Sequence, residues 1–233
     1  MKTIGLVGGM SWESTLEYYR IINEKVKERL GGFHSGEIVL YSVDFSAIEV
    51  LQRRGEWDRM AEMLVKTFRR IEAAGADFGL LCTNTMHKVF DEVQKNVRIP
   101  LVHIVDVTGR AISARGLRRV GLLGTRFTME QEFYKGKLGS DYGIDVLIPD
   151  EQERQAIHAI IYNELCLGQV NDASREVFKK IIRSLEDRGA QGIVLGCTEI
   201  PLLVKQEDQA LPLFDTTDLH ARAAVDLALR GQS

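Results

Sequence analysis

GADFGLLCTNT, residues 75–85, returns as GAQGIVLGCTE at residues 189–199, and the two align without a gap. Each copy is a short apolar run followed by small and hydroxyl-bearing residues, the pattern of a buried strand that ends in a loop. The alignment matches Thr83 with Cys197 and Cys82 with Gly196. A repeat of this kind indicates two lobes built on one architecture.

Two further segments repeat in the same order: Ile4–Gly8 matches Val120–Gly124, and Ile99–Asp106 matches Leu211–Asp218. Short apolar runs alternate with longer segments of helical spacing, which predicts an α/β protein with mainly parallel strands. The expected strands cover residues 3–7, 37–43, 78–81, 101–105, 119–123 and 192–195. The expected helices cover residues 14–30, 57–74, 130–138, 151–167, 172–188 and 217–229.

We therefore predict two similar three-layer α/β domains related by pseudo-twofold symmetry. The first comprises residues 1–103 with 210–233, and the second comprises residues 104–209. Ligands of such folds bind beyond the carboxyl ends of parallel strands, where the connecting loops gather. The two lobes thus predict an active site in one cleft between them.

Composition argues against several classes of partner. The net charge of −3 and the isoelectric point near 6.0 provide no basic excess, so we expect no nucleic acid. The first residues fit a β-strand better than a signal peptide, and no apolar run approaches the roughly 20 residues of a membrane span. Three widely spaced cysteines without a CxxC suggest neither a disulfide framework nor a zinc site. The expected setting is a reducing cytoplasm, without membrane or metal.

The turn around Cys197 contains the candidate reactive thiol. Gly196 permits close backbone approach, and the backbone N–H groups beside the Thr198 hydroxyl could bind an anion. The alternative is a buried, inert cysteine at a strand end. The internal repeat favours a reactive thiol, because it places the same turn at the same point of both lobes.

Neighbouring side chains of an extended segment point to opposite sides, so Cys82 and Thr83 cannot both face the cleft. The repeat assigns Thr83 to the cleft and Cys82 to packing. Cys166 follows the apolar spacing of a helix, which favours a core position over a role in lining the site.

Three other segments hold candidate binding residues. Asn84 and Thr85 could anchor a substrate carboxylate or simply cap a helix, and His87 could assist proton transfer or be structural. The turn at residues 8–11 lacks a nucleotide-binding pattern and is expected to line the cleft with the backbone of Met10. Residues 52–58, which begin with Gln52, could form a lid carrying a guanidinium or an ordinary solvated loop.

Together these motifs resemble the aspartate/glutamate racemases, which work without pyridoxal phosphate, and in particular a bacterial subgroup specific for L-aspartate and L-glutamate. The likeness covers essentially the whole chain. It rests on Lys2–Met10, Asn84–His87, Gly121–Thr125 and Gly196–Glu199. It implies a homodimer of two-domain chains without cofactor, a small acidic amino acid as substrate, and two cysteines flanking the substrate Cα.

The chain departs from the family pattern at two points. Thr83 stands where the family has its first catalytic cysteine, and a hydroxyl is a far weaker acid than a thiol, whose pKa is about 8.5. The resemblance therefore implies one-sided catalysis, with L-enantiomers used and D-enantiomers used poorly. The arginine and lysine that bind the distal carboxylate in family members that use aspartate are also missing, because Ile48 or Glu49 and Cys166 occupy their places. Gln52, Arg53 or Arg54 could substitute.

The sequence thus predicts an isomerase with Cys197 and Thr83 as its catalytic residues. The predicted substrate-binding residues are Asn84, Thr85, Thr198, Met10, Gln52 and Thr125, and the residues that could contribute further are Cys82, Cys166, Glu199 and His87. Two rival hypotheses are a decarboxylase or cis-trans isomerase of the same superfamily, and a small-molecule sensor that kept the cleft but lost the first thiol.

Overall fold

The computed structural model describes residues 1–231 and contains two four-stranded parallel sheets. The strand orders are β2-β1-β3-β4 and β6-β5-β7-β8. The chain divides into two compact units: residues 1–104 together with the segment from His220 onward, and residues 105–219. The predicted fold class, two α/β units with parallel sheets, is confirmed.

The first unit alternates strands and helices in the order expected of a parallel sheet. Its elements are β1 (Ile4–Gly8), α1 (Trp12–Leu30), β2 (Ile38–Ser42), α2 (Phe45–Arg54), α3 (Trp57–Ala73), β3 (Phe78–Leu81), the 3-10 helix η1 (Thr85–Val89), α4 (Phe90–Lys95) and β4 (Leu101–Val102). The last helix of the chain, α11 (Thr216–Ala228), also contributes to it.

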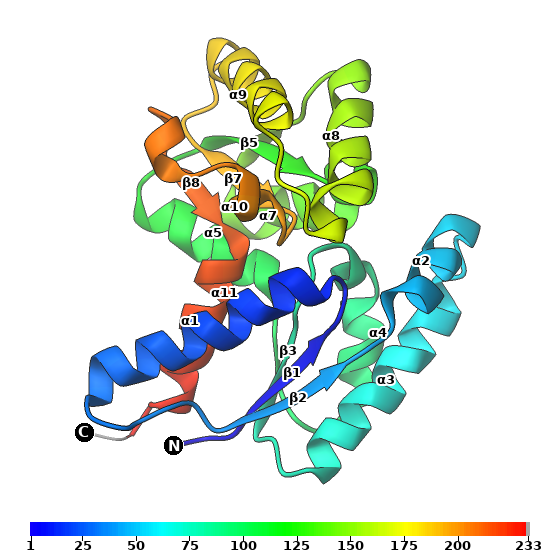
Figure 1. Ribbon diagram of the computed structural model, residues 1–233, viewed down its shortest axis with the longest axis vertical. Coiled ribbons are helices and arrows are strands. Elements are labelled where there is room, and N and C mark those ends of the chain that lie inside the picture. The colour runs from blue at the N-terminus through cyan, green and yellow to red at the C-terminus, as the bar shows by residue number, and fades with distance from the viewer. Residues whose placement is uncertain (232–233) are drawn as a thin grey trace. The chain divides into compact units, whose positions relative to one another are not determined.

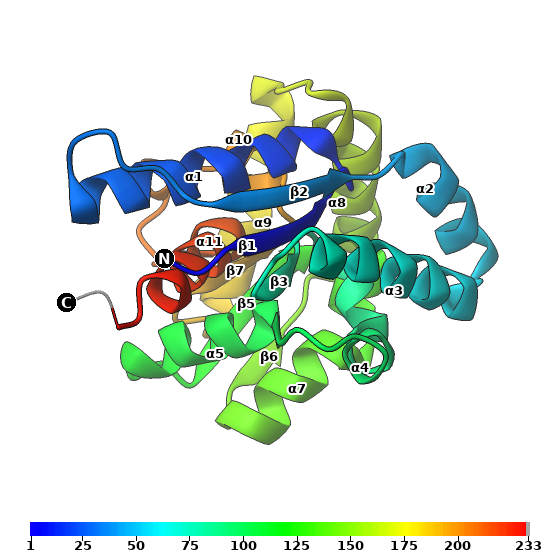
Figure 2. The ribbon, with the colours of Figure 1, turned by 90° about the horizontal axis from the view of Figure 1, so that it is seen from below.

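Helices cover both faces of the first sheet (Figures 1 and 2). Side chains alternate along β1: Leu6 joins a core cluster with residues of α1 and α11, whereas Val7 joins a second cluster with residues of α3. Strand β3 does the same, with Leu80 in the first cluster and Leu81 in the second. This alternation fixes which side chains face which layer where each strand ends.

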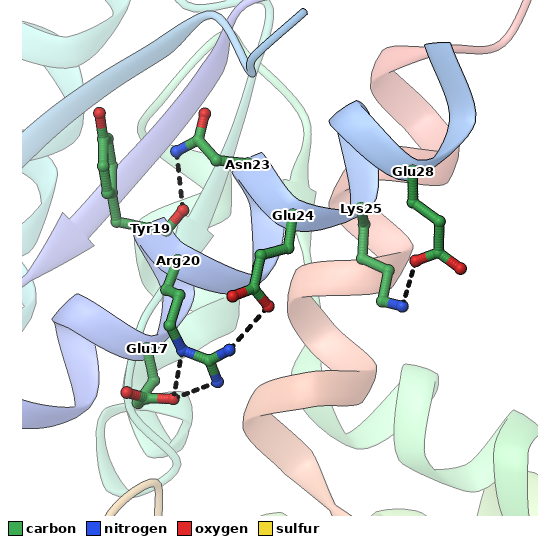
Figure 3. A network of polar contacts seen from close by, with 7 residues as sticks. All are labelled: Glu17, Tyr19, Arg20, Asn23, Glu24, Lys25 and Glu28. Atoms are coloured by element: carbon green, nitrogen blue, oxygen red, sulfur yellow. Dashed lines mark hydrogen bonds and ion pairs between the residues drawn. The ribbon is translucent and has the colours of Figure 1, made fainter. Parts of the chain in front are cut away.

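The outer face of α1 is stabilised by ion pairs within the helix (Figure 3). Arg20 contacts Glu17 at 2.6 Å and Glu24 at 2.7 Å, and Lys25 pairs with Glu28. Such exposed pairs contribute only a few tenths of a kcal/mol each. The burial of Tyr18 and Ile22 on the opposite face therefore accounts for most of the stability of α1.

The second unit repeats this plan. Its elements are α5 (Ile104–Ala114), β5 (Arg119–Gly124), α6 (Arg126–Glu130), α7 (Glu132–Tyr142), β6 (Asp145–Leu147), α8 (Glu151–Asn163), the 3-10 helix η2 (Leu165–Leu167), α9 (Asp172–Asp187), β7 (Ile193–Gly196), α10 (Ile200–Leu203), the 3-10 helix η3 (Gln206–Asp208), β8 (Leu213–Asp215) and the start of α11.

The registers of the two sheets agree with the sequence repeat. In the first sheet Val7 pairs with Leu81, and in the second sheet Leu123 pairs with Leu195. Gly124 and Gly196 form the last pair of β5 and β7. Thr125 follows Gly124 in the sequence, and Cys197 follows Gly196. The loop that carries Thr83 and the loop that carries Cys197 therefore leave equivalent strands at equivalent positions within their own units.

The structure differs from the sequence analysis around residues 210–219. These residues are assigned to the first lobe by the sequence, but β8 pairs with β7 in the second sheet. The chain enters the first unit only at His220, where Ala221 and Ala224 of α11 pack against the first sheet. Residues 104–105, expected at the end of a strand, begin α5 instead.

Within residues 1–231, none of the helices combines the length and the apolar character that crossing a membrane requires.

Candidate functional site

The two cysteine-bearing turns give Cys82 and Cys197 different surroundings. Cys82 is fully buried and packs in the core cluster that contains Leu6, Leu80 and Tyr18. Burial raises the pKa of its thiol far above the usual range. Cys82 therefore occupies a core position, on the sheet face covered by α1 and α11.

Thr83 directly follows Cys82 and is held by the backbone and by His87. Its N–H donates to the carbonyl of Leu81 at 2.8 Å, and its carbonyl lies 2.8 Å from Nδ1 of His87. Nε2 of His87 accepts from the N–H of Ile104 at 3.2 Å, so the proton of the neutral ring is on Nδ1 and is donated to Thr83. Burial, His103 and His220 keep the pKa of His87 well below its usual range. The ring thus supports the loop instead of offering a free acid or base.

Asn84 and Thr85 complete this turn, and both are buried. Asn84 stands at the N-cap position of η1, but its side chain makes no capping hydrogen bond. Ordinary capping, the alternative considered from the sequence, therefore does not explain Asn84. Buried amide and hydroxyl groups beside Thr83 are suitable donors for a carboxylate.

The turn after β1 is shaped by Gly9, whose φ is 86°. A Cβ at Gly9 would lie 2.3 Å from the carbonyl oxygen of Val43, so only glycine fits. The N–H of Gly9 donates to the hydroxyl of Thr15 at 2.8 Å. The side chain of Met10 is buried in the core cluster on the α3 face.

Residues 52–58 do not form a loop lid. They contain the end of α2, a left-handed turn at Gly55 and the start of α3. Arg53 pairs with Glu49 at 2.7 Å and Arg54 with Glu56 at 3.7 Å, both on the surface. Of the two alternatives considered from the sequence, a guanidinium-bearing lid and an ordinary solvated loop, neither describes this segment, because α2 continues through both arginines. Gln52 is 4% exposed, and its Nε2 donates to the sulfur of Met86 at 3.4 Å.

Cys197 lies at the end of β7 with its thiol directed at a carboxylate. Its Sγ donates to Oε2 of Glu199 at 2.9 Å, and Oγ1 of Thr198 donates to the same oxygen at 3.0 Å. All three residues are buried. Burial first, then the charge of Glu199 and the neighbouring Cys166, raise the pKa of the Cys197 thiol well above its usual value, while the backbone N–H of Glu199 acts in the opposite direction.

Close approach of β5 and β7 positions this turn. A Cβ at Gly124 would lie 2.8 Å from the carbonyl oxygen of Gly196, so the two strand ends are in tight backbone contact. Thr125 follows Gly124 and caps α6 by accepting from the N–H of Thr128. Thr125 and Cys197 thus each directly follow one member of the last residue pair of two neighbouring strands, at the edge of the sheet where ligands of such folds bind.

Cys166 belongs to η2 and is half-buried. The segment around it is fixed by Glu164, which accepts from Asn171 at 2.8 Å and from Ser174 at 2.7 Å. The 3-10 helix η2 contacts α10, the helix that follows the Cys197 turn, and a charge on Cys166 would raise the pKa of the Cys197 thiol. The structure therefore places the helix of Cys166 next to the segment that follows the candidate thiol, which the helical spacing of the sequence did not favour.

Two residues of these turns are not singled out by the sequence analysis. Thr15 accepts from Gly9, and the hydroxyl of Thr128 lies 3.2 Å from that of Thr125. For Thr128 a capping pattern, Thr-x-x-Thr before a helix, was available in the sequence. Across the described residues, no group of three or more His, Cys, Asp or Glu side chains could hold a metal ion.

Two surface cavities of the first unit, of about 510 Å³ and about 330 Å³, are lined by none of the candidate residues. The larger cavity lies along α3 and α4, and the smaller one along α3 and the end of β2. Both mix acidic and basic side chains, and neither has a thiol or a histidine.

Comparison with known proteins identifies the family of the chain. The family model of the Asp/Glu/hydantoin racemases matches residues 7–224. The chain belongs to this family. A crystal structure from Yersinia pestis assigned to the Asp/Glu racemases superposes with a TM-score of 0.91, at 51% identity over 99% of this chain and 100% of the other. An aspartate racemase homologue from Pyrococcus horikoshii gives a TM-score of 0.84 at 36% identity, over 98% and 99% of the two chains.

The broad-specificity amino-acid racemase RacX of Bacillus subtilis is another relative. It is 24% identical to this chain, over 99% of this chain and 100% of RacX. Glutamate racemase from Francisella tularensis, solved with D-glutamate, has a TM-score of 0.72 at 16% identity and supports the fold alone. Racemases are isomerases, so family membership identifies the chain as an enzyme of that class.

Proposed function

We propose that this protein is a cofactor-independent racemase of acidic amino acids, with Cys197 as the group that takes the α-proton. The single observation that carries the proposal is the buried Cys197 thiol at the end of β7, hydrogen-bonded to Glu199 at 2.9 Å. A thiol can act as base and acid at carbon once its surroundings control its protonation.

Inversion at Cα requires one group to remove the proton and a second group to return a proton to the opposite face. Thr83 is our proposed residue for the second face, because its loop leaves β3 as the Cys197 loop leaves β7. A hydroxyl can relay a proton but is a poor resting base. The proposal therefore expects L-enantiomers as substrates and little exchange from D-enantiomers.

The amino-acid carboxylate would be bound by donors of the two turns. Asn84, Thr85 and Thr125 contribute buried amide and hydroxyl groups, and Thr198 adds a hydroxyl next to the thiol. The backbone of the turn at Met10 would line the same ligand. A preference for glutamate and aspartate rests on likeness to the racemases of acidic amino acids, and the buried amide of Gln52 is our candidate partner for the distal carboxylate.

We also propose a homodimer in a reducing compartment such as the cytoplasm. None of the three cysteines, which all lie in the described part of the chain, forms a disulfide bond, as a reducing compartment favours. Trp12, Leu16 and Tyr19 line one exposed stripe of α1, where a second copy could bury them.

Proton NMR in deuterated water tests the proposal. The protein is incubated separately with L-glutamate, L-aspartate and their D-forms, and the loss of the α-proton signal is followed with the enantiomer formed. The proposal expects exchange from the L-forms only. Efficient turnover of D-glutamate would contradict the role of Thr83. Absence of exchange from all four would overturn the proposed function and favour the decarboxylase, tested on a malonate, or the sensor.

A further inference from the structure

The carboxylate of Glu199 is buried and accepts hydrogen bonds from a thiol and a hydroxyl of the Cys197 turn. Glu199 is 1% exposed, and its Oε2 lies 2.9 Å from Sγ of Cys197 and 3.0 Å from Oγ1 of Thr198. Burying a carboxylate is costly unless hydrogen bonds compensate it. Here two of the compensating donors belong to the Cys197 turn itself, so the states of the carboxylate and of the thiol are coupled.

This arrangement presents a difficulty for a thiol that must act as a base. Hydrogen bonding to a carboxylate favours the protonated thiol, and burial has the same effect. Glu199 and Cys166 are the ionisable groups that raise the pKa of Cys197. In the free protein the thiol is therefore protonated at neutral pH, although removal of an α-proton requires the thiolate.

Binding of the substrate can favour the thiolate form of Cys197. An amino acid carries its ammonium group one bond, about 1.5 Å, from Cα. When Cα is close enough to Sγ for proton transfer, the ammonium group lies within a few ångströms of Sγ, which is also where Oε2 of Glu199 lies. A cation at Oε2 would neutralise the carboxylate and replace the thiol as its hydrogen-bond donor.

We propose that Glu199 is the positioning residue that sets the protonation state of Cys197, keeping it a thiol in the free protein and releasing it as a thiolate when the α-ammonium group of the substrate binds Oε2. In this step the S–H bond breaks heterolytically: the electron pair stays on sulfur and the proton passes to the solvent. No oxidant or reductant is involved. The inference rests on the proposed function in one respect, the assignment of Cys197 as the base.

Titration of the free protein tests whether Glu199 keeps Cys197 protonated in the absence of substrate. Thiolate formation at Cys197 is followed by ultraviolet absorbance against Cys197→Ser, and by iodoacetamide labelling located by peptide mass spectrometry. In Glu199→Gln the midpoint should fall by at least about one pH unit, because a neutral amide replaces the charge. Glu199→Asp, which keeps a carboxylate, should shift less. An unchanged or raised midpoint in Glu199→Gln would overturn the inference.

Two controls accompany the titration. Glu186→Gln is the same chemical change at an exposed site in α9 and should leave the midpoint unaltered. Cys166→Ser removes the other group that acts on the thiol and should lower the midpoint by less than Glu199→Gln. Thermal unfolding of each variant establishes that it is folded before its midpoint is compared.

Steady-state kinetics test whether the α-ammonium group of the substrate binds the carboxylate of Glu199. Glu199→Gln should raise KM for the amino acid on the order of tenfold, since an amide is a weaker partner for an ammonium group than a carboxylate. An unchanged KM would overturn the ammonium site. Failure of the proposed function is distinguishable from failure of this inference. If the proposed function is wrong, the parent protein shows no exchange, but the Cys197 titration still responds to Glu199→Gln.

Discussion

The carbonyl oxygen of Thr83 accepts a hydrogen bond from Nδ1 of His87 at 2.8 Å. The same ring accepts from the N–H of Ile104 at 3.2 Å through Nε2. A single neutral imidazole thus ties the loop after β3 to the first residue of α5. The position of Thr83 depends on a side chain four residues further along the chain, which itself needs no contact with the substrate.

Replacing this ring should loosen the loop. His87→Ala removes two hydrogen bonds to buried backbone groups and leaves a cavity, so we expect the free energy of unfolding to fall by about 2–4 kcal/mol. Urea unfolding of His87→Ala and the parent measures the change. His34→Ala, at an exposed histidine in a loop, should have no measurable effect. Equal losses in the two variants would contradict the anchoring role of His87.

A second buried histidine predicts a pH dependence of stability. Nε2 of His220 lies 2.8 Å from the carbonyl of Val102 and therefore carries the proton, and Nδ1 accepts from the hydroxyl of Tyr18 at 2.9 Å. Burial is the main cause that lowers the pKa of His220 to about 3. In the unfolded chain histidine has a pKa of about 6.5. Below that pH the unfolded state therefore binds a proton at His220, whereas the native state leaves the ring neutral. Stability from His220 is thus full above pH 6.5 and is lost as the pH falls.

Between about pH 7.5 and about pH 5 this group should cost the protein about 2 kcal/mol of unfolding free energy. The measurement is the difference in urea unfolding between the parent and His220→Gln at both pH values, which cancels the contribution of other titrating groups. The parent should lose about 2 kcal/mol more than the variant over this interval. Parallel pH profiles would show that the pKa of His220 does not differ between the folded and unfolded states, and would contradict the prediction.

Tight contact at the ends of β5 and β7 predicts intolerance of a methyl group. A Cβ at Gly124 would lie 2.8 Å from the backbone oxygen of Gly196, so Gly124→Ala should destabilise the protein by about 1–3 kcal/mol. It should also displace the turn of Cys197 and slow exchange. Gly139→Ala, in α7 with its nearest neighbouring atom at 3.8 Å, should be neutral or stabilise by up to about 1 kcal/mol. Thermal melting of both variants checks the contrast.

Restoring a thiol at residue 83 tests the one-sided mechanism. Thr83→Cys would place an acid of pKa about 8.5 at the second face, so exchange of the α-proton from D-glutamate should rise at least about tenfold over the parent. The matched control Thr85→Ser keeps a hydroxyl in the same loop and should not confer D-glutamate exchange. No gain from Thr83→Cys, in a folded variant, would argue against a role for residue 83 in proton transfer.

The internal repeat explains why much of the fold could be predicted. Residues 78–81 and 193–196 are continuous apolar runs, which indicate buried parallel strands, and both are strands in the structure. The short strands β6 and β8 were missed because three residues of mixed burial leave no clear period. Residues 101–105 form one apolar run, and nothing local marks the change from strand to helix at Ile104.

The site was predicted less completely, for a physical reason. Sequence position limits which face Cys82 and Thr83 can take, because side chains alternate along a strand. It does not determine the rotamer that brings the carboxylate of Glu199 to 2.9 Å from Cys197, nor the path of η2 that brings this 3-10 helix into contact with α10, the helix after the same thiol. Both contacts depend on turns whose direction is set by packing within the second unit.

The measurement that tests the central claim most directly is α-proton exchange from L-glutamate in deuterated water, followed by proton NMR for the parent, Cys197→Ser and Cys166→Ser. We predict that Cys197→Ser lowers the exchange rate by about a hundredfold to ten-thousandfold, since a serine hydroxyl cannot form a comparable base, while Cys166→Ser retains most of the activity. Exchange that persists at the parental rate in folded Cys197→Ser would contradict the assignment of Cys197 as the residue that takes the α-proton.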